Sequence, residues 1–82
     1  MREKIINAVL EAIENVLGLP QDEMREQLDL DLFENELIDS LGCASLISEI
    51  EELLDKDVPI ENFDLGDFKS INTLVDAVAK FM

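Results

Sequence analysis

Apolar residues recur at intervals of three and four along three stretches of this chain, and this spacing predicts three amphipathic helices. The stretches cover residues 2–17, 40–54 and 71–81. Gly18 and Pro20 predict the end of the first helix, because glycine favours the backbone turn that stops a helix and proline cannot continue one. The residues expected to be buried are Ile5, Ile6, Val9, Ala12, Ile13, Val16, Leu17, Cys43, Leu46, Ile47, Ile50, Leu53, Leu54, Ile71, Leu74, Val75, Val78 and Phe81.

Polar residues just before two of these stretches predict helix caps. Asp39 or Ser40 can cap the second helix and Ser70 the third, because their side-chain oxygens accept hydrogen bonds from the free N–H groups of a first turn. Val58 and Pro59 cannot continue the second helix.

The connections between the stretches are irregular. Residues 18–39 form a long connection that leucines and Phe33 pin to the core, with a short helical piece possible at Gln21–Gln27. A loop of this length in a small domain is often functional. In residues 60–69 we expect Phe63, Leu65 and Phe68 to anchor the chain to the core, with one helical turn around residues 65–68.

These elements predict an all-α fold, a small bundle of three to four helices with a long first loop. The chain has 82 residues, of which 48% are hydrophobic. That is enough for one small core, so we expect a single domain over residues 1–82 and a monomer.

The net charge of the chain limits the classes of partner that it can bind. Asp and Glu number 20 against 6 Lys and Arg, which gives a net charge of −14. Nucleic acid and anionic membranes are repelled by such a surface, whereas basic protein partners are attracted. Eight of the acidic residues lie between residues 22 and 39, where Arg25 is the one basic residue.

The groups that ordinary catalysis needs are scarce. The chain has no His, and its single cysteine, Cys43, falls on the buried stripe of its helix, where a core thiol is expected. Asp29 and Asp31 match only part of a calcium-binding loop, so we read them as solvated charges. We therefore expect no catalytic residue and no metal site. One cysteine, no secretory signal and no long apolar run indicate a cytoplasmic protein that does not enter the membrane.

One segment, residues 33–42, places a hydroxyl at the junction of the long loop and the second helix. Ser40 follows Asp39 and precedes Leu41 and Gly42. Taken alone, this arrangement needs no more explanation than a helix cap, which would make the protein an acidic helical interaction module.

The junction, the loop before it and the acidic helix after it together resemble the acyl carrier and peptidyl carrier family along essentially the whole chain. In that family a phosphopantetheinyl transferase attaches 4′-phosphopantetheine covalently to the serine of an Asp-Ser-Leu motif. The resemblance implies that Ser40 is this serine, and that the protein is a carrier rather than an enzyme. The resemblance further implies that this carrier would hold its cargo as a thioester on the terminal thiol of the phosphopantetheine arm.

Two features resemble the D-alanyl carrier proteins of Gram-positive bacteria. Gly42 stands where many fatty-acid carriers have Asp, and the run from Val58 to Asp64 followed by Asp67 and Phe68 is similar to theirs, although Trp is frequent near the last position. Ser45 stands where fatty-acid carriers usually have Glu. The alternative is a stand-alone acyl or aminoacyl carrier of a fatty-acid, polyketide or nonribosomal-type pathway.

The D-alanyl resemblance also implies partners. An AMP-forming ligase would load D-alanine, and a membrane acyltransferase would use it to D-alanylate lipoteichoic acid in cell-wall biogenesis. We expect these partners to bind one face of the second helix, where residues at intervals of three and four share a side. That face comprises Leu41, Ser45, Ser48, Glu49 and Glu52.

Overall fold

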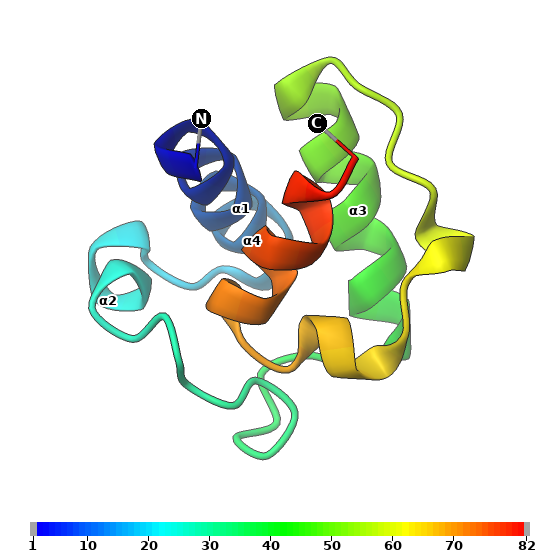
Figure 1. Cartoon of the computed structure of the whole chain (residues 1–82). Helices are drawn as coiled ribbons and strands as arrows, with labels where there is room; N and C mark the ends of the chain where they lie inside the picture. Colours follow the sequence, from blue (N-terminus) through cyan, green and yellow to red (C-terminus); the bar gives the residue numbers. More distant parts are fainter. Residues whose placement is uncertain (1, 82) are drawn as a thin grey trace.

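Three helices build the core of the computed structural model, which describes residues 2–81 (Figure 1). They are α1 (Arg2–Leu17), α3 (Ser40–Leu54) and α4 (Ile71–Ala79). No strand occurs within residues 2–81, so the predicted all-α fold is confirmed. The first two helices have the predicted bounds, whereas the third ends two residues earlier than its apolar pattern suggested.

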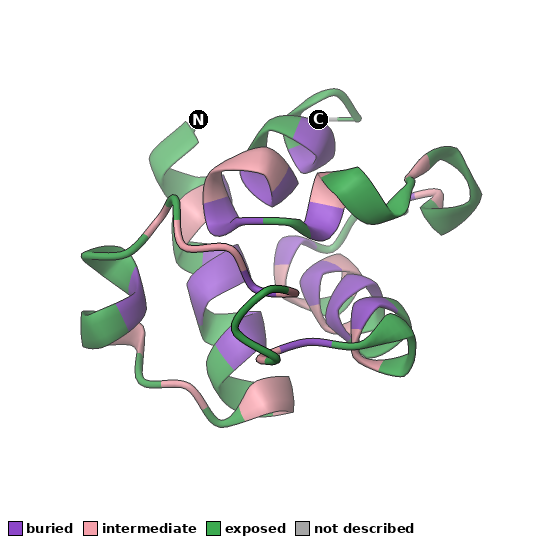
Figure 2. Ribbon diagram, turned by 90° about the horizontal axis from the view of Figure 1, so that it is seen from below, coloured by how far each residue is buried: buried purple, intermediate pink, exposed green. Residues whose placement is uncertain are grey.

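Helix α1 packs against both α3 and α4. Its buried face is therefore wider than the predicted stripe and also includes Ala8 and Leu10. The buried residues of the three helices face one another in the interior (Figure 2). Each fully buried aliphatic side chain stabilises the fold by about 1.5–3 kcal/mol relative to exposure, so this shared interface supplies most of the stability.

The predicted stop of α1 at Gly18 and the predicted cap of α4 at Ser70 are confirmed. Gly18 has a φ of 75°, a left-handed conformation that glycine adopts without strain, and its N–H donates to the Glu14 carbonyl at 3.0 Å. At the start of α4, the Ser70 hydroxyl accepts from the Thr73 N–H while the Thr73 hydroxyl accepts from the Ser70 N–H. This reciprocal pair satisfies donors that a helix leaves free at its first turn.

The connection between α1 and α3 is mostly irregular, as predicted, and it contains the short helix α2 (Gln21–Arg25). Met24 of α2 is buried, a core position that its isolated place in a polar segment did not reveal. Further along, Leu32 is fully buried and fastens the loop to the core.

Between α3 and α4 the chain forms two 3-10 turns, η1 (Ile60–Asn62) and η2 (Leu65–Phe68). Phe68 is buried and Phe63 is partly buried, but the prediction that Leu65 anchors the core is wrong, since 60% of this residue is exposed. A four-residue turn brings only one of its ends to the core, and Phe68 occupies that place.

Phe81 also departs from its prediction as a buried residue of the last helix. It lies beyond α4 and is 37% exposed. Its ring stacks on that of Phe63, with centroids 5.6 Å apart. Phe63 in turn contacts Phe68 at 5.8 Å, so the three rings close one side of the bundle.

Candidate functional site

Ser40 is the first residue of α3 and is exposed to solvent. The residue before it, Asp39, is the helix cap: its carboxylate accepts from the Gly42 N–H at 2.7 Å. Of the two capping residues that the sequence allowed, the structure therefore uses Asp39. The Ser40 hydroxyl is not needed for that task.

Gly42 fits this first turn because it lacks a side chain. A Cβ at this position would lie 3.3 Å from both Asp39 Oδ1 and Ile38 Cγ1 and 3.6 Å from Leu17 Cδ2. The end of α1 and the end of the loop thus approach the first turn of α3 closely. A larger residue here would press on the cap itself.

The predicted partner face is exposed at most of its positions. Leu41 is 82% exposed, whereas Leu46 and Ile50 of the same helix are fully buried, as predicted. Ser45, Ser48 and Glu52 continue the exposed stripe along α3. Ala44 belongs to the same stripe, but no chemical signal in the sequence separates it from a core alanine.

Two glutamates of α3 accept hydrogen bonds from groups outside this helix. Glu49 is partly buried and accepts a hydrogen bond from the Asn15 side chain of α1 at 2.9 Å, so it lies at the edge of the partner face. Glu51 accepts from the Val58 N–H at 2.7 Å and holds the chain that returns from α3. Its carboxylate therefore has a structural partner.

Cys43 lies one turn below Ser40 and is buried, as predicted. Burial raises the pKa of its thiol, and the nearby Asp39 carboxylate raises it further because a second negative charge would be repelled. The neutral thiol behaves as a small apolar core residue.

Residues 2–81 contain neither a candidate metal-binding cluster nor a candidate membrane-spanning helix. No group of three or more His, Cys, Asp or Glu residues lies in an arrangement that could hold a metal ion. None of the helices is both long and apolar enough to cross a membrane.

A comparison with protein families agrees with a site at the start of α3. Residues 7–78 match the family model described as a phosphopantetheine attachment site. The chain belongs to this phosphopantetheine-attachment family. Members of the family are carrier proteins, and this carrier bears a covalently attached 4′-phosphopantetheine, whose terminal thiol holds cargo as a thioester.

Individual relatives of the carrier are similar over most of its length. A D-alanyl carrier protein of Lacticaseibacillus rhamnosus is 33% identical over 76 residues, which cover 93% of this chain and 91% of the relative. A D-alanyl carrier protein of Latilactobacillus sakei is 32% identical over 69 residues, 84% of this chain and 86% of the relative. A third, from Lacticaseibacillus casei, is 32% identical over 76 residues. No solved structure matched significantly.

The start of α3 fits the group that the family bears. The first backbone hydrogen bond of the helix runs from the Cys43 N–H to the Asp39 carbonyl at 3.0 Å, and the Gly42 N–H is held by the cap. The N–H groups of Ser40 and Leu41 thus lie outside the helical ladder at the exposed end. Free N–H groups and the helix dipole favour an anion such as a phosphodiester at this position.

Proposed function

We propose that Ser40 is the residue that bears the phosphopantetheine group and that the cargo is D-alanine. The observation that carries the first part is the exposed Ser40 hydroxyl at the start of α3, with the capping task already taken by Asp39. A modifying enzyme can reach this hydroxyl, and its modification removes no hydrogen bond on which the helix depends.

The other serines offer poorer settings. Ser70 is only 6% exposed, and its hydroxyl accepts from the Thr73 N–H in the cap of α4. Ser45 and Ser48 are exposed but lie in the body of α3, where the backbone N–H groups are engaged in the helix. Only Ser40 combines exposure with the positive end of a long helix.

The loading step follows from this arrangement. The Ser40 oxygen forms a bond to the phosphorus that carries the pantetheine arm of coenzyme A. The bond from this phosphorus to the oxygen that bridges the two phosphates breaks, and adenosine 3′,5′-bisphosphate departs. The hydroxyl proton passes to a base of the transferase. The Ser40 end of α3 then holds the anionic link.

The proposal for the cargo is supported by the relatives named above and by Gly42. An AMP-forming ligase would load D-alanine at the expense of ATP, and a membrane acyltransferase would take it for D-alanylation of lipoteichoic acid. Since coenzyme A and ATP are the substrates of the first two steps, we place the carrier in the cytoplasm.

Intact-mass measurement tests the attachment site. The purified protein is incubated with coenzyme A and a phosphopantetheinyl transferase of broad specificity, and one phosphopantetheine adduct is expected. Ser40→Ala should give none while its circular dichroism remains helical, and the matched variants Ser45→Ala and Ser48→Ala should each still take up one adduct. An adduct on Ser40→Ala would overturn the assignment.

A second experiment tests the cargo. The loaded carrier is incubated with ATP, a D-alanine ligase and either D-alanine or L-alanine, and in parallel with an acyl-carrier ligase and a fatty acid. A thioester adduct with D-alanine alone is expected. Exclusive loading with a fatty acyl chain would contradict the D-alanine proposal and leave the attachment site standing.

A further inference from the structure

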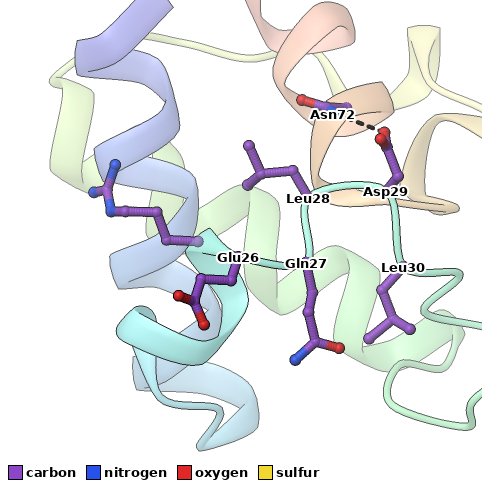
Figure 3. A pocket seen from close by; sticks show the side chains of 7 residues that line it. Glu26, Gln27, Leu28, Asp29, Leu30 and Asn72 are labelled. Carbon is purple, nitrogen blue, oxygen red and sulfur yellow. Dashed lines mark hydrogen bonds between the residues drawn. The ribbon is translucent and has the colours of Figure 1, made fainter.

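The first turn of α4 holds the loop that leads to Ser40. The Asn72 N–H donates to the Leu28 carbonyl at 3.0 Å, and the Asn72 side-chain amide donates to the Asp29 carboxylate at 2.6 Å (Figure 3). Asn72 and residues 25–30 line a cleft of about 390 Å³, at whose rim the Asn72–Asp29 bond closes the gap between the loop and α4. One residue thus binds the loop through both its backbone and its side chain.

The attachment continues toward Ser40. The Leu32 N–H donates to the Lys69 carbonyl at 2.7 Å, and the Lys69 ammonium lies 4.0 Å from the Asp31 carboxylate. Leu32 is fully buried, and its carbonyl accepts from the Leu37 N–H at 2.8 Å. The loop passes beneath the start of α4 and enters α3 (Figure 1). We define the loop clamp as the contacts of residues 28–32 with residues 69–72.

The clamp holds a strongly charged segment. From Asp29 to Asp39 the loop has five acidic residues and no basic one. These carboxylates repel one another and would push a free loop outward. The two groups that Asn72 offers are hydrogen-bond donors, so they hold the loop without adding a charge of their own.

We propose that Asn72 is a positioning residue for the modification of Ser40. It fixes the acidic loop in one place beside the start of α3, so that a transferase meets a preformed surface. This inference rests on the proposed function of Ser40. Releasing the loop would lower the fraction of carrier that is ready to bind and would leave the chemical step intact.

Steady-state kinetics of transferase loading test the inference. Asn72→Ala should raise KM for the carrier about fivefold, the factor that corresponds to the loss of one net hydrogen bond, with kcat unchanged. Asn72→Asp should raise it further, because its carboxylate would face Asp29. The double variant Asp29→Asn with Asn72→Asp restores a donor–acceptor pair and should return KM toward the wild-type value.

The matched control is Gln21→Ala. The Gln21 side chain also donates from an amide to a carboxylate, that of Glu14 at 2.8 Å, but it joins α2 to α1 instead of holding the loop. The KM of the transferase for Gln21→Ala should equal its KM for the wild-type carrier. An unchanged KM in Asn72→Ala, or no recovery in the double variant, would overturn the inference.

Hydrogen exchange separates this inference from the proposed function. In Asn72→Ala the Leu32 amide should exchange faster, while the amides of α1 keep their protection. If wild type were never loaded by any transferase, the proposed function would fail and exchange at Leu32 would still decide whether the clamp exists. Equal exchange at Leu32 in both proteins would count against it.

Discussion

Neighbouring residues at the start of α3 serve different purposes. Asp39 turns its carboxylate back onto the Gly42 N–H, whereas Ser40 turns its hydroxyl to solvent and Cys43 its thiol to the core. The stability of the helix and the chemistry of the site therefore depend on different side chains. Two predictions concern these single residues.

Asp39→Ala should lower the free energy of unfolding by about 1 kcal/mol, because a helix cap of this kind contributes about that amount. Ser40→Ala should change it by less than about 0.5 kcal/mol, as is usual for exposed positions without a partner. Urea unfolding of the two variants and wild type measures both effects. A larger loss for Ser40→Ala would mean that the hydroxyl has a structural role.

Cys43 should make stability depend on alkaline pH. Its pKa is raised above the ordinary value of 9.0 by burial and by Asp39, so the folded state holds the proton more tightly than the unfolded chain does. The resulting stability is fully present below pH 9.0 and is lost as the pH rises from there through the raised pKa. The melting temperature should thus fall above that pH.

The control for this prediction is Cys43→Ala, which has no thiol to ionise. It should melt lower at neutral pH because of the small cavity, but with a shallower decline on the alkaline side. All other side chains are common to both proteins, so their effects cancel in the comparison. If the melting temperatures of the two proteins fell equally steeply with rising pH, ionisation of the Cys43 thiol would not be what destabilises the folded state.

Among the elements, α3 has two sides with different tasks. Its apolar side packs against α1, and its other side presents Leu41, Ser45, Ser48 and Glu52, with Glu49 held at the edge by Asn15. Because this exposed stripe begins next to Ser40, we expect a partner that reaches the site to contact it.

Reversing the charge of Glu49 and Glu52 to Lys should raise KM for loading by the ligase roughly two- to thirtyfold, since each exposed ion pair contributes about 0.2–1 kcal/mol. The effect should shrink as salt rises, because exposed pairs are screened. Glu11→Lys, an exposed reversal on α1, is the matched control. Unchanged loading kinetics in the double reversal would exclude this face.

At the scale of the whole molecule, the net charge of −14 is spread over a small body with a radius of gyration of 11.1 Å. Within the part of the chain that the structure describes, the ion pairs are Arg2–Asp76, Arg25–Glu3 and Lys69–Asp31. Most carboxylates therefore face solvent or one another. Their repulsion acts against the compact state.

Raising sodium chloride from low to moderate concentration should accordingly raise the melting temperature by several degrees, since about 1 kcal/mol shifts a domain of this size by roughly 4–8 °C. Magnesium chloride at equal ionic strength should act alike if screening alone is responsible. A melting temperature that stays flat across the sodium chloride series would mean that the carboxylates are too well solvated to matter.

Local signals in the sequence determined the parts of this protein that depend on neighbours along the chain. The periods of apolar residues located α1, α3 and α4, and the caps at Gly18 and Ser70 marked their ends, because a helix is closed by hydrogen bonds within a few residues. The same signals placed Ser40 at a loop–helix junction. Its role as the attachment residue remains a prediction.

Only the tertiary structure decided which of several equally apolar or polar residues reaches a given partner. Leu65 and Phe68 have similar hydrophobicity, yet the space beside Phe63 admits only the second. Likewise, nothing around Asn72 in the sequence indicates that it binds Asp29, 43 residues away. These contacts join segments that are distant along the chain, and they form only when the helices pack. The local pattern of apolar and polar residues therefore does not predict them.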